Sequence, residues 1–464
     1  MFEHEDIAAL VSETTRENFK DPRLVKRLGL IVSKVAANPS MSFPKIFSSS
    51  AELEAAYRFF ANPVVTPDAI LDAHFKATQQ QCKQEPVVLV VHDTSTFAFN
   101  PEGDRVGLGR VGKKGQAFFG HCSLALSDDG SRKPLGVAAL KTWIRGVEPK
   151  KGDERPRWIE AVRLATDRLG ETEKLVHIMD READDYQLFE QMIGGHHRFI
   201  IRLAHDRLLA ETSPLEPHKI REASLRITSV VHRDAKVSKR VDGDRLPKQK
   251  KIHPSRAPRT ATLSIGASRI TLKRPAPQSR ALPDSLAISL VRVWEAAPPN
   301  GEEPIEWLLA TTEPIETQDD LLRIVDRYRA RWTIEEFFKG LKTGCSIEER
   351  QLGDYEGLVN ALAVFLPIAC RMLWLRSEAS RAPDAPALRV ATEEQLEVLR
   401  ALGPRKLPTD PTTSDVLLAI AALGGHIKWN GPPGWLTISR GYTELLTLTR
   451  AWSAAKLQYK CDQS

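Results

Sequence analysis

The sequence predicts a multidomain α/β protein, and three observations carry that prediction. The chain has 464 residues, which exceeds the size of one hydrophobic core and suggests two to four domains at about 150 residues each. Continuous β-branched runs that are typical of buried strands, at residues 86–93 and 175–179, stand between segments of helical apolar spacing. With 42% hydrophobic and 27% charged residues, the composition is that of a soluble globular protein.

The first 80 or so residues are expected to form helices broken by short turns at Asn38-Pro39, Pro44 and Asn62-Pro63. Basic side chains gather there beside aromatic ones. Such a module fits DNA binding, although a solvated surface explains the charges equally well. Over the whole chain, 66 basic residues against 60 acidic ones is too small an excess to indicate nucleic acid by itself.

The next segment alternates strands and helices. We expect a strand, an antiparallel pair, a helix, a second buried strand, a helix and a third strand, at residues 86–93, 118–126, 135–144, 158–169, 175–179, 184–193 and 198–202. This order predicts a mixed sheet. The first and second buried strands are predicted to end on Asp93 and Asp180, and ligand sites of such sheets lie at the carboxyl ends of strands. Taken alone, a strand-end aspartate is often only a helix N-cap or a turn former.

From about residue 206 to 320 the composition shifts, and we interpret this block as a β-rich insertion in the α/β domain. Strands are expected at residues 262–265, 270–272, 286–293 and 305–310. Within the block, residues 233–259 hold ten Lys or Arg against three Asp and read as an extended basic arm. Beyond residue 350 the chain is expected to be helical again, at 357–376, 392–402, 413–423 and from 442.

The cysteines and the apolar segments indicate in which cellular compartment the protein is expected. The five cysteines are scattered without a CxxC pair, which indicates neither a zinc site nor a disulfide framework and suits a reducing cytoplasm. The acidic first residues lack the apolar region of a signal peptide. The longest apolar run, at residues 361–370, contains a proline and is too short to span a bilayer. A cytoplasmic protein without a membrane span is therefore expected.

Residues 328–342 combine charged and apolar positions at helical spacing. If they form one helix, its rotation of about 100° per residue places Tyr328, Arg331, Glu335 and Lys342 within a sector of roughly 60°. A carboxylate that can hold a cation, flanked by groups that bind phosphate, is what phosphodiester chemistry needs. The alternative is an amphipathic helix with a solvated charged face.

Three carboxylates together would suffice for metal chemistry. Asp93, Asp180 and Glu335 are the minimum set for holding two divalent cations about 4 Å apart. Magnesium takes carboxylate oxygens and leaves positions open for a phosphate.

These segments resemble the catalytic blocks of a known family. Asp93-Thr-Ser, Asp180-Arg-Glu-Ala-Asp and the Tyr-Arg-Glu-Lys spacing of residues 328–342 are similar to DDE transposases of the insertion-sequence-four family. The resemblance implies a ribonuclease H-like mixed-sheet core with a β-rich insertion, an N-terminal domain that recognises DNA ends, and a C-terminal helical dimerisation domain. We place their bounds at residues 81–375, 1–80 and 376–464.

Carried over by position, the resemblance implies roles for nine residues. Asp93, Asp180 and Glu335 would be the catalytic, metal-binding triad. Tyr328, Arg331, Lys342 and Arg202 would contact DNA phosphates. Trp307 would stack on a flipped base, and Phe119 stands where the family has a second stacking tryptophan. From the residues alone, Arg202 could equally be a surface charge and Trp307 a core residue. His121, Trp332 and Glu336 also match the family, without a role that the sequence explains.

The resemblance further implies cut-and-paste transposition. Mg²⁺, with Mn²⁺ as a substitute, would support nicking, hairpin formation, hairpin opening and strand transfer at a two-metal site. The partners would be double-stranded DNA, with terminal inverted repeats and target DNA, and a second copy of the chain in a synaptic complex. Two alternatives remain: a metal-dependent nuclease without strand transfer, and a catalytically silent regulator that binds DNA ends. A glycosidase carboxylate pair explains neither the basic arm nor the phosphate-facing groups.

Overall fold

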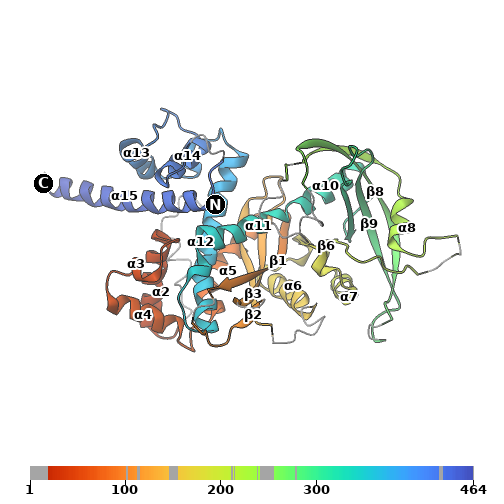
Figure 1. Cartoon of the computed structure of the whole chain (residues 1–464), viewed down its shortest axis with the longest axis horizontal. Coiled ribbons are helices and arrows are strands. Elements are labelled where there is room, and N and C mark those ends of the chain that lie inside the picture. Colours follow the sequence, from red (N-terminus) through yellow and green to blue (C-terminus); the bar gives the residue numbers. More distant parts are fainter. Residues whose placement is uncertain are drawn as a thin grey trace. The chain divides into compact units, whose positions relative to one another are not determined.

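The structure is a computed structural model, shown in Figure 1, and it describes residues 19–100, 103–111, 115–145, 155–210, 213, 215–237, 239–240, 255–276, 280–427 and 432–462. Most of the predicted basic arm, residues 241–254, lies outside this range, as do residues 1–18 of the predicted N-terminal domain. The chain divides into two compact units. Unit 1 comprises residues Met1–Gly170 and Trp332–Ser464, and unit 2 comprises Glu171–Arg331.

The N-terminal part of unit 1 is helical, as predicted. Three of its helices are capped by a side chain that accepts a hydrogen bond from a backbone N–H of the first turn. Proline fits in the first turn because it has no backbone N–H that would need a partner there. The caps are Asp21, Ser49 and Thr66. The helices are α2 (Pro22–Ala37), α3 (Phe43–Ile46), α4 (Ser50–Phe60) and α5 (Pro67–Lys83).

Antiparallel strands follow in unit 1. The long strand β3 pairs with each of the other three, which are β1 (Val88–Phe99), β2 (Gly109–Val111) and β4 (Pro134–Trp143), and β3 itself spans Gly115–Ser127. The predicted antiparallel pair, now β3 and β4, is confirmed. Helices α5 and α6 (Arg155–Leu169) pack on β4.

One apolar helix, α12 (Tyr355–Arg381), forms the centre of unit 1. It contacts α2, α4 and α5 on the N-terminal side, and α14 farther along the chain (Figure 1). By length and composition α12 could cross a membrane, but 94% of its most apolar window is buried inside the protein. The other elements in this half of the unit are α11 (Trp332–Lys339), the π-turn η3 (Gly340–Gly344), the 3-10 turns η4 (Ile347–Glu349) and η5 (Ala387–Arg389), α13 (Glu393–Leu402), α14 (Thr413–Leu423) and α15 (Trp435–Asp462).

Unit 2 is built on one mixed sheet with the strand order β5-β6-β10-β9-β8-β7. The pair β5–β6 is parallel and the other neighbours are antiparallel. The strands are β5 (Leu175–Met179), β6 (Arg198–Arg202), β7 (Val231–Val237), β8 (Arg259–Lys273), β9 (Ser285–Glu295) and β10 (Glu306–Thr311). The other elements are η1 (Thr172–Lys174), η2 (Arg181–Ala183), α7 (Tyr186–Gly194), α8 (Ile220–Leu225) and α10 (Gln318–Arg329).

The predicted strands at 262–265 and 270–272 are one strand, β8. It pairs with β9 without a break from Leu263 to Lys273. The pairing therefore includes residues 266–269, which lie between the two predicted strands. Gly266 is needed inside it because a Cβ atom there would lie 2.1 Å from the Thr228 carbonyl oxygen. The strands predicted for the β-rich block thus extend the same sheet as β5 and β6.

Candidate active site

Residues 328–342 do not form the single helix that their spacing predicts. Helix α10 ends at Arg329, and α11 begins at Trp332. Between them, the Arg331 N–H bonds to the Tyr328 carbonyl, three residues back, which tightens the turn. The apolar positions before the break pack in unit 2, and those after it pack in unit 1. The interpretation of residues 328–342 as one helix is therefore wrong: Tyr328 and Arg331 belong to unit 2, whereas Glu335 and Lys342 belong to unit 1.

Asp93 lies in the middle of β1, not at its end as predicted. The strand continues to Phe99 because Phe97 and Phe99 alternate inward and β3 pairs with β1 along its whole length. Asp93 is half-buried opposite Cys122, and one carboxylate oxygen accepts the Thr94 N–H at 2.8 Å. Burial first, and the Asp93 charge second, raise the pKa of the Cys122 thiol.

Buried histidines fix β1 against β3 on either side of Asp93. His92 Nδ1 lies 3.0 Å from Ser123 Oγ, and His121 Nδ1 lies 2.9 Å from Thr94 Oγ1. Burial lowers the pKa of His121 to about 3, so this ring is neutral. His121, which matches the family without a role from the sequence, thus joins the residue that follows Asp93 to β3.

Glu335 lies on α11, which packs directly on β1 in unit 1. The contact includes Phe97 and Phe338, whose ring centroids are 6.3 Å apart. Lys342, in the π-turn, donates to the Thr96 carbonyl at 2.6 Å and lies 3.5 Å from the Glu348 carboxylate. The structure therefore places Asp93, Glu335 and Lys342 on elements that pack together.

Asp180 follows the last residue of β5 in unit 2, as predicted, and is half-buried. Its side chain accepts the Glu182 N–H at 2.9 Å, so it also caps the short turn η2. The second aspartate of the motif has another task. Asp184 is buried and accepts from the N–H groups of residues 204 and 205 and from the Arg207 guanidinium, which orders the loop after β6.

Four predicted DNA-contacting residues gather in unit 2. Arg202, the last residue of β6, donates to the Glu306 carbonyl at 3.3 Å, and it interacts electrostatically with the Tyr328 side chain. Trp307 on β10 is half-buried, with its ring centroid 5.5 Å from that of Tyr328 and 6.0 Å from the Arg202 guanidinium carbon. Arg331 is close enough to act on the charge of both Arg202 and Tyr328. Trp307 is thus not a core tryptophan.

This arginine–aromatic cluster, formed by Arg202, Trp307, Tyr328 and Arg331, gathers positive charge. Burial lowers the pKa of Arg202, and the neighbouring charges of Arg181 and Arg331 lower it further, although Tyr328 opposes them. Burial raises the pKa of Tyr328, and Asp180 adds to that shift. Arg181 is a cation that the site prediction omits, and its position in the quoted motif next to Asp180 is the signal that could have identified it.

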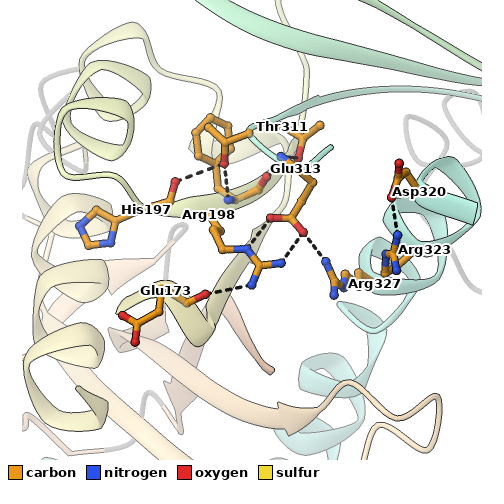
Figure 2. Close-up of polar contacts among 10 residues, drawn as sticks. Glu173, His197, Arg198, Thr311, Glu313, Asp320, Arg323 and Arg327 are labelled. Atoms are coloured by element: carbon orange, nitrogen blue, oxygen red, sulfur yellow. Dashed lines mark hydrogen bonds and ion pairs between the residues drawn. The ribbon is translucent and has the colours of Figure 1, made fainter. Parts of the chain in front are cut away.

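A buried ion cluster supports α10 next to this group (Figure 2). Glu313, just after β10, is 3% exposed. Arg198 of β6 reaches it with two hydrogen bonds of 2.8 and 2.7 Å, and Arg327 of α10 forms a further ion pair with it. Because Arg327 directly precedes Tyr328, the cluster fixes the end of α10 against β6.

Phe119, the second predicted stacking residue, is 6% exposed in unit 1. Trp143 stacks on it with ring centroids 5.8 Å apart, and the Arg145 guanidinium lies 4.1 Å from its ring centre. A base could stack on Phe119 only after one of these neighbours moves, so its role stays a prediction.

The three candidate carboxylates are suited to hard cations. Asp93, Asp180 and Glu335 are each half-buried, so solvent reaches them, and carboxylate oxygens are the ligands that Mg²⁺ prefers. Backbone N–H groups orient two of them. Within the described ranges, no group of three His, Cys, Asp or Glu side chains lies close enough together to hold a metal ion.

Comparison with known families adds to this geometry. A family model described as "Transposase DNA-binding" matches residues 7–65, and one described as "Transposase DDE domain" matches residues 107–366, more than half of the chain. The chain belongs to the DDE transposase family. This transposase is therefore a nucleic-acid-processing enzyme with DNA as its partner. The DDE match includes Asp180 and Glu335, whereas Asp93 precedes it.

The family also confirms the predicted fold class. The mixed pairing of β5 and β6 with antiparallel neighbours, flanked by helices at both ends of the chain, agrees with the ribonuclease H-like core of a DDE transposase. The DNA-binding match lies within the N-terminal helical segment that the sequence predicts for this role.

Proposed function

We propose that this transposase belongs to the insertion-sequence-four group and catalyses cut-and-paste transposition at the terminal inverted repeats of its own element. The reaction would proceed by nicking, hairpin formation, hairpin opening and strand transfer. The observation that supports it most is the placement of two sets of residues. Asp93 on β1, Glu335 on α11 and Lys342 in the following π-turn lie on elements that pack together, and an arginine–aromatic cluster lies beside Asp180.

Asp93, Asp180 and Glu335 would bind two divalent cations, Mg²⁺ or Mn²⁺. When bound, such cations lower the pKa of an attacking water or 3′-hydroxyl and stabilise the leaving oxygen. Arg202, Arg331 and Lys342 would bind phosphate oxygens, and Tyr328 would complete that contact. Trp307, half-buried at the edge of this cluster, would receive an unstacked base.

Two copies of the chain would hold the two ends of the element in a synaptic complex, with dimer contacts made by the C-terminal helical domain. The predicted domains, residues 1–80, 81–375 and 376–464, would divide end recognition, chemistry and pairing among them.

The test uses the purified transposase and a duplex that carries the inverted repeat flanking its gene. With Mg²⁺ we expect nicking, a hairpin intermediate and joining to target DNA. Alanine at Asp93, Asp180 or Glu335 should reduce cleavage by about a thousandfold or more, because the metal ligands supply much of the barrier reduction. Asp319→Ala is the control, since this carboxylate is exposed on α10 and should not affect cleavage.

Three results would lead to other conclusions. Full cleavage by the triad variants would refute the site. Cleavage without joining would favour the nuclease, and binding without cleavage would favour the regulator.

A further inference from the structure

Glu336, which follows the candidate metal ligand Glu335, is the centre of a second polar cluster. Its carboxylate accepts the indole N–H of Trp435 at 3.2 Å. Lys339 on the same helix donates to it at 2.6 Å, and the Arg376 guanidinium of α12 lies 3.6 Å away. Three groups from three helices therefore converge on one side chain of α11.

Trp435 is the first residue of α15, and it is 6% exposed. One side of its ring faces the Arg376 guanidinium, at 4.8 Å from the ring centre. The ring also lies over Gly340, where a Cβ atom would be 3.4 Å from the indole. Gly340 starts the π-turn that carries Lys342, so the indole packs against the beginning of that turn.

A second contact from α15 holds the other end of the π-turn. Ser439, fully buried one turn along the helix, donates through its hydroxyl to the Gly344 carbonyl at 2.7 Å. Turns of π type are rare, and they occur mostly at functional sites. Here the turn that positions Lys342 is contacted at its first and last residues by α15.

We propose that Glu336 and Trp435 are positioning residues through which the C-terminal helix α15 sets the place of Glu335 and Lys342. Neighbouring residues on a helix move as one body, so a shift of α11 that breaks the Glu336 contact displaces Glu335 equally. This inference rests on the proposed function, since it assigns to Glu335 a metal and to Lys342 a phosphate. It also gives Glu336 the role that the sequence leaves open.

The test compares two tryptophans of α15. Trp435→Phe keeps a ring between Gly340 and Arg376 but removes the N–H that Glu336 accepts. Trp452→Phe is the matched control, because Trp452 also donates its indole N–H to a glutamate, Glu397, at 3.3 Å, but on the α13 side of α15. Glu336→Gln tests the same contact from α11.

The first readout needs neither DNA nor metal. Hydrogen–deuterium exchange of a peptide that spans residues 335–345 should be faster in Trp435→Phe and Glu336→Gln than in the wild type, and unchanged in Trp452→Phe. The second readout is single-turnover cleavage as a function of Mg²⁺ concentration. The two variants should be slower by about tenfold, as expected for a lost hydrogen bond to a charged group, and should need more Mg²⁺ for half-maximal cleavage.

Equal exchange in all variants would overturn the inference. So would faster exchange with an unchanged Mg²⁺ requirement, because α15 would then stabilise the turn without positioning Glu335. A wild type that does not cleave would refute the proposed function instead, and the exchange comparison of the two tryptophan variants would still decide whether α15 supports the catalytic helix.

Discussion

Both units bury arginines, but they balance the charge in different ways. In unit 1, Arg350 is among the largest fully buried side chains; it lies against the rings of Phe43 and Phe365 and donates to the carbonyls of Pro39, Met41 and Cys345. In unit 2, Arg198 and Arg327 share the carboxylate of Glu313 (Figure 2). In unit 1 backbone carbonyls and aromatic rings stabilise the buried guanidinium, whereas in unit 2 a carboxylate stabilises the buried guanidinium groups.

The difference shows what each buried group holds in place. Two of the carbonyls bound by Arg350 belong to the turn after α2, so this side chain attaches the N-terminal helices to the segment that follows α11. Asn360 of α12 does the same by donating to the carbonyls of Phe60 and Val65. The Glu313 cluster instead joins a helix to a sheet, next to the arginine–aromatic cluster.

The largest expected effect breaks the ionic side of this comparison. Arg327→Ala should lower the free energy of unfolding by about 2–3 kcal/mol, because Glu313 loses one of its two buried cationic partners and keeps Arg198. Arg323→Ala is the matched control on the same helix, since its pair with Asp320 is half exposed and should contribute less than about 1 kcal/mol. Urea unfolding of both variants measures the difference, and equal losses would contradict the assignment.

Acid should affect the two units alike. Burial lowers the pKa of His121 in unit 1 to about 3, and burial with the charge of His197 lowers the pKa of His177 in unit 2 to about 3. Below pH 6.5 the unfolded state binds protons that the folded state does not, so stability is full above pH 6.5 and falls as the pH decreases.

Each of these histidines should contribute a loss of about 2 kcal/mol between pH 6.5 and 5. Thermal unfolding across that range, with NMR titration of both rings, measures the effect. Titration of either ring near pH 6.5 in the folded protein would exclude that histidine from the effect.

The smallest effect tests the neutral side of the comparison. Asn360→Leu should cost about 1–2 kcal/mol, because the carbonyls of Phe60 and Val65 lose a buried donor. Hydrogen exchange should increase in α4 and in the turn after it, with β6 and α10 unchanged. A uniform increase over both units would show that Asn360 does not act locally.

Local pattern in the sequence was sufficient for most elements. Strand β6 and helix α14 have the predicted bounds, and β5 ends directly before Asp180 as predicted. Buried strands and capped helices are predictable because their signals lie in residues that are neighbours in the sequence. The DDE transposase family could likewise be predicted from the sequence, and the family match confirms it, whereas the candidate carboxylates stay a prediction.

Partners distant in the chain decided the rest. Pairing with β3 extends β1 beyond Asp93, and the helix expected at residues 328–342 is interrupted at residues 330–331, where one unit ends and the other begins. Trp143 and Arg145 cover Phe119, and Trp435, 99 residues from Glu336, gives that glutamate a contact. The periodicity of the sequence indicates which face of an element is apolar. It does not indicate which hydrophobic core that face packs into, or which side chains from distant parts of the chain contact the element. The residue types of the site were therefore determined by the sequence, and their supports only by the tertiary structure.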